Sequence, residues 1–238
     1  MFSFPSNVRF SETDEDSRLT TLALLNYFQD CTVFHSGTLG LGPDSERESG
    51  KAWLLAAWQI EIEDLPSLFD PIVVSTWGTG AKGTFATRNF TMATPDGRTL
   101  ARADSLWFLY DAAVGRPVRL TPEDWAPYMA DDAPLDMPPT SRKLRTEGPG
   151  EPRPSVAVAK HHLDTNHHVN NAQYVEIARE ALDTPVAVRR IQVQYKKAAV
   201  LGDTIVPVVH AEKDGVAVRL TDGADADFAI VKLLGRES

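Results

Sequence analysis

The sequence predicts an α+β protein with two similar halves, each of which places one helix before an antiparallel series of strands. Three observations support this fold class. An apolar helical segment precedes several strand-like segments twice along the chain, Asp-Gly dipeptides mark tight turns, and a proline-rich stretch separates the two series. The length of 238 residues lies between one large domain and two small ones.

The first half begins with a short strand expected at residues 8–11. In the helix that follows, Leu24, Phe28 and Cys31 share one apolar face, with Leu25 beside them. The strands expected after this helix are rich in β-branched and aromatic residues and cover residues 53–62, 72–78, 84–93 and 99–110. Asp96-Gly97 is the hairpin signal between the last two.

The second half repeats this order. A strand is expected at residues 156–162, and the helix after it carries an apolar stripe of Ala172, Val175, Ala178 and Leu182. The strands expected next cover residues 186–195, 204–211, 216–220 and 226–234. Asp-Gly dipeptides at 214–215 and 222–223 mark the turns between them.

Residues 131–154 form the clearest break in composition, because this stretch holds six prolines. Proline lacks a backbone donor and fixes φ, so the stretch is not expected inside a sheet and is interpreted as a linker. The predicted organisation is an N-terminal domain at 1–130, the linker at 131–154 and a C-terminal domain at 155–238.

Two segment matches indicate an internal duplication. Residues 14–21 can be laid over residues 164–171, with Asp14 matching Asp164, and residues 60–70 over residues 193–203. The matches occur in the same order along the chain. A sheet with a single apolar helix buries both by wrapping around the helix, an arrangement called a hotdog. The sequence therefore predicts a tandem, or double, hotdog with a long central helix in each half.

Composition limits the classes of function. The formal net charge is −9, which argues against binding nucleic acid or an anionic membrane through charge. No run approaches the roughly 20 apolar residues of a membrane helix, and the start has no signal-peptide pattern. Cys31 is the only cysteine, so no intrachain disulfide can form. A cytoplasmic protein without membrane insertion is expected.

The densest polar cluster lies at residues 161–171, in the loop that enters the second helix, and contains four of the six histidines. Asp164, Asn166 and His168 stand at alternate positions and can converge on one face of an extended loop, as a base, an orienting group and a proton shuttle. Backbone amides at the start of the helix, at Val169 and Asn170, can stabilise an oxygen that becomes anionic.

Two structural interpretations of this cluster stay open. Asn170 or Asn171 can simply cap the helix, since asparagine is a preferred capping residue. The histidines can also bind a metal, although their spacing matches no common zinc pattern. No metal and no cofactor are expected.

The run Asp164-x-Asn166-x-His168-Val169-Asn170-Asn171-x-x-Tyr174 resembles the signature of acyl-acyl-carrier-protein thioesterases, the plant-type terminators of fatty-acid synthesis and their bacterial relatives. The resemblance extends to Trp77-Gly78, to the Asp96-Gly97 hairpin and to residues 103–107. It implies hydrolysis of an acyl thioester to a free fatty acid and the carrier thiol. It also implies that Asp164, Asn166 and His168 are the catalytic residues.

The first half has Arg18 where the second has His168, so it is expected to supply the acyl pocket rather than the chemistry. The aromatic residues proposed for the pocket wall are Trp53, Trp58, Phe85 and Trp107, for which core packing is the alternative. The family also places a glutamate after a Tyr-basic-basic run. Here Ala198 and Ala199 follow Tyr195-Lys196-Lys197, and neither can act as acid, base or nucleophile. Loss of one general base predicts hydrolysis slower by about 10²-fold.

The expected partner is an acyl carrier protein bearing a fatty acyl thioester. Because carrier proteins are acidic, a locally basic surface is expected, with candidates in the linker and around the second-half strands. These candidates are Arg142, Lys143, Arg145, Arg189, Arg190, Lys196 and Lys197. Three rivals remain: an acyl-CoA thioesterase, a hotdog dehydratase or hydratase, and a non-catalytic acyl-thioester binder. Both a monomer and a homodimer are compatible with the sequence.

Overall fold

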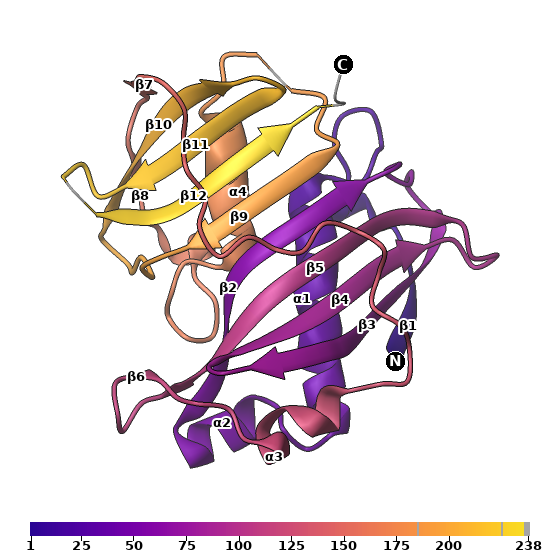
Figure 1. The fold of residues 1–238 in the computed structure, drawn as a ribbon. Coiled ribbons are helices and arrows are strands. Elements are labelled where there is room, and N and C mark those ends of the chain that lie inside the picture. The colour runs from indigo at the N-terminus through magenta and orange to yellow at the C-terminus, as the bar shows by residue number, and fades with distance from the viewer. Residues whose placement is uncertain (185, 225, 236–238) are drawn as a thin grey trace. The chain divides into compact units, whose positions relative to one another are not determined.

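The computed structural model describes residues 1–184, 186–224 and 226–235 (Figure 1). The chain divides into two compact units. The first contains Met1–Ala56 and Ile62–Thr140, and the second contains Ala57–Glu61 together with the chain from Ser141 onward. Both are built from antiparallel strands with few helices, so the predicted α+β class is confirmed.

The first unit begins with strand β1 and the long helix α1. Its elements are β1 (Phe2–Asn7), α1 (Thr21–Thr38), α2 (Pro43–Ser49), β2 (Lys51–Ile62, of which Ala57–Glu61 belongs to the second unit), β3 (Pro71–Lys82), β4 (Phe85–Ala93), β5 (Thr99–Asp111), β6 (Arg116–Pro117) and α3 (Pro122–Trp125). Strands β1, β3, β4 and β5 are hydrogen-bonded in that order, and β6 pairs with β5.

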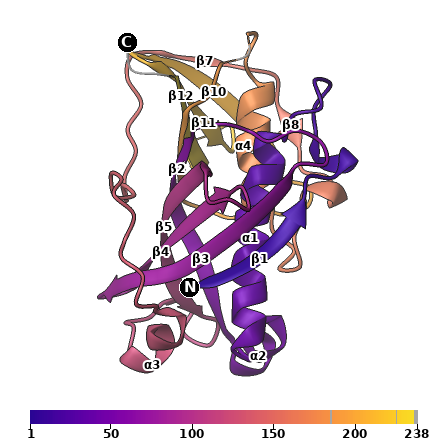
Figure 2. The same cartoon turned by 90° about the vertical axis from the view of Figure 1, so that its right-hand side faces the viewer.

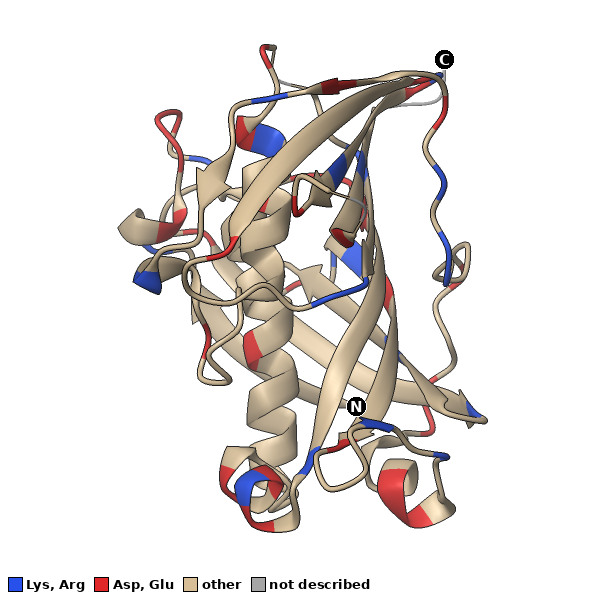
Figure 3. Ribbon diagram, turned by 90° about the vertical axis from the view of Figure 1, so that its left-hand side faces the viewer, with Lys and Arg blue, Asp and Glu red and all other residues tan. Residues whose placement is uncertain are grey.

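Helix α1 packs against β3 and β1, as the side view of this unit shows (Figure 2). Leu24, Leu25, Phe28 and Cys31 are fully buried, which confirms the predicted apolar face. Asp30 is the single Asp, Glu, Lys or Arg in this helix, which is otherwise drawn without charge (Figure 3). The helix therefore supplies much of the core of the unit.

The second unit repeats the plan with a shorter helix. Its elements are β7 (Gly150–Pro152), β8 (Val156–Ala157), α4 (Asn171–Glu180), β9 (Arg190–Tyr195), β10 (Thr204–Glu212), β11 (Gly215–Thr221) and β12 (Asp227–Leu234). Strands β9, β12, β11, β10 and β7 are neighbours in that order, β8 also pairs with β10, and Ala57–Glu61 of β2 pairs with β9. The helix packs against β12 and β11, and its residues Val175 and Ala178 are fully buried.

The prediction of strands at residues 8–11 and 156–162 is wrong for most of their length. Phe10–Glu12 and Lys160–His162 are 3₁₀ helices, and only Val156–Ala157 is a strand. The amide of Arg9 donates to Glu12 Oε2 at 2.9 Å, and the amide of Ala159 donates to His162 Nδ1 at 3.0 Å. These local bonds favour a turn over pairing with a neighbouring strand.

Part of the proline-rich segment does join a sheet. Gly150–Pro152 pairs with β10 as the last strand in the hydrogen-bonded order of the second unit, where a proline is tolerated. A Cβ at Gly150 would lie 2.5 Å from Val208 Cγ1, so glycine allows the close approach of the two strands. No helix in the described part of the chain is long and apolar enough to span a membrane.

The two segments matched in the sequence make the same hydrogen bonds in their own units. The amide of Leu19 donates to the carbonyl of Pro66 at 2.8 Å, and that of Val169 donates to Ala199 at 2.9 Å. Equally, the amide of Ser67 donates to Asp70 Oδ2 at 2.8 Å, and that of Val200 donates to Asp203 Oδ2 at 2.9 Å. The likeness of the halves therefore extends to individual backbone contacts.

One position of this repeat differs in backbone strain. Phe69 has φ of 72° and a largely exposed ring, whereas Gly202 occupies the matching position with φ of 91°. A left-handed conformation is unfavourable for a residue with a Cβ but not for glycine.

We expect Phe69→Gly to raise the unfolding free energy by about 0.5–1 kcal/mol, and Gly202→Ala to lower it by about 1 kcal/mol, in urea titrations. Opposite signs would contradict this assignment of strain.

Candidate active site

The loop that carries the predicted catalytic residues is a tight turn at the start of α4. The amide of Asp164 donates to the carbonyl of His168 at 2.8 Å, and the amide of His167 donates back to the carbonyl of Asp164 at 3.1 Å. His167 has φ of 60°, which closes the turn. The chain between Asp164 and His168 is thus folded on itself rather than extended as expected.

The carboxylate of Asp164 is used by this turn. Its Oδ1 accepts the amide of Asn166 at 2.8 Å and the amide of His168 at 3.3 Å. Such bonds from an aspartate to the backbone ahead of it stabilise a turn. The structure therefore places Asp164 where it fixes the backbone of the other two predicted residues.

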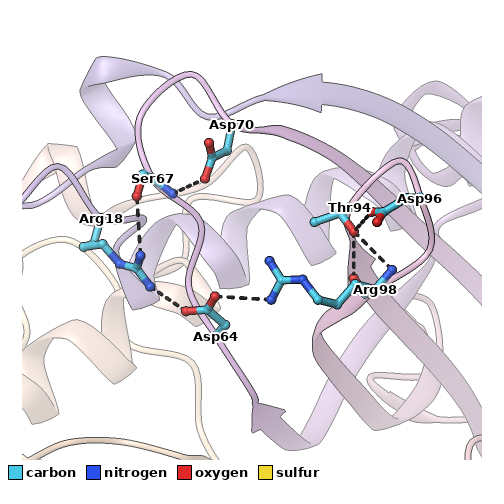
Figure 4. Close-up of polar contacts among 7 residues, drawn as sticks. All are labelled: Arg18, Asp64, Ser67, Asp70, Thr94, Asp96 and Arg98. Atoms are coloured by element: carbon cyan, nitrogen blue, oxygen red, sulfur yellow. Dashed lines mark hydrogen bonds and ion pairs between the residues drawn. The ribbon is translucent and has the colours of Figure 1, made fainter.

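The first unit contains the same turn without the histidine. Asp14 Oδ1 accepts the amide of Asp16 at 3.1 Å and the amide of Arg18 at 2.8 Å, and Ser17 has φ of 59°. The arginine takes the place of His168 and donates to Asp64 Oδ1 at 2.5 Å (Figure 4). Since this aspartate is used for the same backbone bonds where no histidine follows, the bonds of Asp164 alone do not identify a catalytic base.

The side chains of the three predicted catalytic residues differ in exposure. Asn166 is exposed at the tip of the turn, whereas Asp164 and His168 are partly buried. The backbone of His168 forms an antiparallel bridge with Val200, in the segment that follows β9. The turn thus brings an amide side chain and an imidazole to the same short loop. The backbone at the end of this loop is hydrogen-bonded to residues 199–200.

The prediction that the amides of Val169 and Asn170 stabilise an oxyanion is wrong. The first donates to the carbonyl of Ala199 at 2.9 Å, and the second donates to the carbonyl of His162 at 2.8 Å, so neither is available to a substrate. The side chain of Asn170 caps the helix by accepting the amide of Ala172 at 2.8 Å, as the alternative interpretation expected. Within the described residues, the amide of Asn171 is the first in α4 without an intramolecular acceptor.

Two tyrosines, buried Tyr174 and half-buried Tyr195, connect α4 to the end of β9 and to the segment after it, where the family glutamate was expected. The amide of Ala199 donates to Tyr174 Oη at 2.8 Å, and Tyr195 Oη donates to the carbonyl of Asn171 at 2.9 Å. Burial raises the pKa of Tyr174 to about 12, so its phenol stays protonated at neutral pH. Ala198, next to this contact, is exposed.

The first unit contains an apolar cavity. Its space amounts to about 400 Å³, open solvent at the mouth included. The side chains around it are Thr32, Ser36, Trp53, Ala86, Thr87, Arg88, Trp107, Trp125, Tyr128 and Met129, with the backbone of Gly78 and Gly80.

Two of the four aromatic residues predicted for the pocket, Trp53 and Trp107, line this cavity. Phe85 instead packs edge-on against Phe108, with ring centroids 6.4 Å apart. Trp58 is buried in the second unit, where its side chain is a hydrogen-bonding neighbour of Tyr195. Sequence periodicity could not separate these two from the others, because all four lie in strands rich in buried residues.

Gly78 shapes one wall of the cavity. A Cβ at this position would lie 2.9 Å from the carbonyl oxygen of Tyr128, so only glycine allows the segment of Tyr128 and Met129 to lie against β3. The bridge between Gly78 and Met129 marks this close approach. The Tyr128 ring is thereby held at the cavity.

The structure also describes Cys31 and basic residues that were candidates for a carrier-binding surface. Burial raises the pKa of the Cys31 thiol to about 12, which disfavours a nucleophilic role. Lys196 is bound to Asp227 at 2.7 Å and Arg190 to Glu61 at 3.7 Å. In the described residues, no three His, Cys, Asp or Glu side chains gather as metal ligands do.

Models of two protein-family domains match the two halves of this chain in order. The model of the acyl-ACP thioesterase N-terminal domain matches residues 2–128, and that of the acyl-ACP thioesterase C-terminal domain matches residues 153–233. The acyl-[acyl-carrier-protein] hydrolases FATB3 and FATB1, chloroplastic, of Cuphea viscosissima are each 25% identical. The first match covers 76% of this chain and 46% of the relative, and the second covers 92% and 58%. The chain thus spans about half the length of these curated relatives.

Two solved structures share the fold. The 12:0-ACP thioesterase from Umbellularia californica superposes with a TM-score of 0.84 at 18% identity, over 100% of this chain and 97% of that one. An acyl-ACP thioesterase from Bacteroides thetaiotaomicron gives 0.82 at 21% identity, over 98% and 96%. Since the two family models together match most of the sequence in the expected order, the chain belongs to the acyl-ACP thioesterase family.

Proposed function

We propose that the protein hydrolyses acyl-acyl-carrier-protein thioesters to a free fatty acid and the carrier thiol. The observation that carries this proposal is the match to both family domains, with the loop of Asn166 and His168 at the start of α4 inside the second. The relatives named above are described as acyl-carrier-protein hydrolases, and the cavity lined by Trp53 and Trp107 supports a binding site for an acyl chain in the first unit.

The proposed chemistry is attack of water on the thioester carbonyl. His168 takes one proton from the water as its oxygen bonds to the carbonyl carbon. The tetrahedral intermediate then collapses: the C–S bond breaks, and the departing sulfur takes the proton from the imidazole, which leaves the free acid, the carrier thiol and neutral His168. Asn166 orients the carbonyl or the water, and the amide of Asn171 is the donor proposed for the developing oxyanion.

Asp164 is a positioning residue in this mechanism. Its two bonds to the amides of Asn166 and His168 hold the turn that presents both side chains. Ala198 leaves the expected position of the family glutamate without an ionisable group. Slower hydrolysis is therefore proposed, since one general base contributes about 10²-fold or more.

The finer fold assignment is part of the same proposal. Each unit combines one principal helix with an antiparallel sheet that packs on it, and the loops before α1 and α4 have matching hydrogen bonds. These features support a tandem hotdog that arose by duplication, with the first half specialised for binding and the second for chemistry.

Release of free thiol from purified protein tests the proposal. Acyl-carrier-protein substrates of medium to long chain length are compared with the same acyl groups on CoA, using a chromogenic thiol reagent. The buried Cys31 contributes little background under native conditions. We expect hydrolysis of at least one carrier substrate. Binding without thiol release would contradict the proposal and favour a non-catalytic binder, and conversion of a hydroxyacyl to an enoyl thioester would favour a dehydratase.

A further inference from the structure

A tyrosine hydroxyl from the start of α4 is bonded to the segment that supports the candidate catalytic loop. Tyr174 is the fourth residue of this helix and only 2% exposed, and its Oη accepts the amide of Ala199 at 2.8 Å. The carbonyl of Ala199 accepts the amide of Val169, the residue after His168, at 2.9 Å. Both backbone polar groups of Ala199 are therefore used, and they link the side chain of Tyr174 to the backbone that carries the imidazole.

A second tyrosine hydroxyl holds the first residue of the same helix. Tyr195 Oη, at the end of β9, donates to the carbonyl of Asn171 at 2.9 Å, and the ring centroids of Tyr195 and Tyr174 lie 5.8 Å apart. The amide of Asn171 is the donor proposed for the oxyanion. Since Tyr195 and Ala199 belong to one short segment, the start of α4 is bonded to that segment at two points.

The first unit lacks the contact between Tyr174 and Ala199. Helices α1 and α4 begin at matching residues, so Leu24, the fourth residue of α1, takes the place of Tyr174. Pro66 takes the place of Ala199 in the second segment match, and proline has no N–H. The carbonyl of Pro66 still accepts the amide of Leu19 at 2.8 Å. The hydroxyl and the amide that it would accept are thus both absent, whereas the contact with the loop is kept.

The second tyrosine is absent from the first unit as well. Its counterpart in the segment match is Ile62, which is buried and has no hydroxyl. The first unit therefore forms the same turn, joined to the same following segment, with aliphatic side chains in both places. It also has Arg18 at the place of His168. Because the turn forms without these hydroxyls, their contacts in the second unit are not a requirement of the fold.

We propose that Tyr174 is a positioning residue for the hydrolysis, which holds the His168 loop in place through Ala199. Tyr195 has the matching part at Asn171, so the imidazole and the proposed oxyanion donor are both fixed by the segment that ends β9 and follows it. Neither tyrosine touches a reacting atom in this scheme. The inference rests on the proposed thioesterase function, because it assigns the support of the same site.

The kinetic test uses Tyr174→Phe, which removes the hydroxyl and keeps the ring. We expect kcat with the best carrier substrate to fall by roughly 10- to 100-fold, since a displacement of about 1 Å in a catalytic group has effects of this order. KM should stay close to that of the wild type, because the side chain does not contact the substrate. In a His168→Ala background the same substitution should have no further effect, because the group that it positions is absent.

Tyr27→Phe is the matched control. Tyr27 is a buried tyrosine of α1 in the first unit, and its Oη donates to Glu12 Oε2 at 2.8 Å. We expect its kcat to equal that of the wild type. An unchanged kcat in Tyr174→Phe, an equal loss in Tyr27→Phe, or an additive loss in the His168→Ala background would overturn the proposal.

A double substitution separates positioning from stability. Tyr174→Leu with Ala199→Pro gives the second unit the residues of the first, Leu24 and Pro66, so no buried amide is left without an acceptor. We expect the urea midpoint to recover from that of Tyr174→Leu toward the wild-type value, whereas kcat stays low in both variants. Recovery of kcat together with stability would mean that the hydroxyl only satisfies the amide. If the double variant does not unfold cooperatively, the His168→Ala background decides.

Amide hydrogen exchange separates this inference from the proposed activity. We expect the amide of Val169 to exchange roughly 10-fold faster in Tyr174→Phe, because its acceptor is held less firmly, and that of Leu19 to be unchanged. Faster exchange in a protein that releases no thiol from any carrier substrate would support the role of Tyr174 in holding the loop and contradict the thioesterase. Thiol release with exchange and kcat unchanged in Tyr174→Phe would support the thioesterase and overturn the role of Tyr174.

Discussion

Replacing His168 by alanine is expected to lower the rate of thiol release by roughly 10²- to 10⁴-fold, the contribution of a positioned general base. His168 is partly buried, and its backbone amide and carbonyl are bound to Asp164 within the turn. These backbone bonds do not depend on the imidazole, so the turn should remain folded. The measurement is kcat with the best carrier substrate, together with thermal unfolding of both proteins.

The first unit offers a matched control for this substitution. Arg18 stands at the same place in the equivalent turn, and its side chain contacts Asp64 and Ser67 (Figure 4). Arg18→Ala removes a partly exposed ion pair, which typically contributes less than about 1 kcal/mol. We expect its kcat to stay close to that of the wild type. If His168→Ala retained full activity, or if Arg18→Ala lost as much, the chemistry would not lie in the second-half loop.

The role of Asp164 is decided by comparing its asparagine and alanine variants. Asparagine keeps an Oδ1 acceptor for the amides of Asn166 and His168, whereas alanine removes it. We expect Asp164→Ala to lower the unfolding free energy by about 1–2 kcal/mol, because two hydrogen bonds are lost. It should also lower kcat by roughly 10²-fold, because His168 is misplaced. Asp164→Asn should retain activity within a few-fold.

Asp14 provides the matched control, because it accepts the equivalent amides of Asp16 and Arg18 in the first unit. Asp14→Ala should lower the unfolding free energy about as much as Asp164→Ala does, with little change in kcat. If Asp164→Asn is as inactive as Asp164→Ala while both are folded, the carboxylate itself takes part in proton transfer. The assignment of Asp164 as a positioning residue would then be wrong.

Together, the variants of His168 and Asp164 and their first-unit controls test which functions the two halves have kept. Both loops keep an aspartate that accepts two backbone amides, which is the requirement of the turn. Only the second loop adds a histidine after it. The expected pattern is that stability depends on Asp14 and Asp164 alike, whereas activity depends on the second loop.

Much of the fold could be predicted from the sequence, because the signals are local. Strands β3 to β5 and β10 to β12 follow β-branched and aromatic runs, and Gly97 and Gly223 adopt positive φ at the predicted turns. The buried face of α1 and the cap at Asn170 follow from helix periodicity and capping preference. The second segment match fell on residues whose backbone contacts do repeat.

The tertiary structure decided what depends on partners distant along the chain. The amide of Val169 donates to the carbonyl of Ala199, and that of Asn170 donates to the carbonyl of His162. No local sequence pattern predicts these two bonds. Trp53 and Trp107 line the cavity while Phe85 and Trp58 pack elsewhere, although all four have the same strand signature. In the sequence, Arg88 cannot be told from any other charged residue of a strand. In the structure its guanidinium lies against the Tyr128 ring, in a segment whose close approach to β3 requires Gly78. The sequence by itself determined the elements and the catalytic candidates, because turns, caps and periodicity depend on residues that are neighbours in the chain. The cavity and the availability of each hydrogen-bond donor depend on contacts between distant residues, so only the tertiary structure decided them.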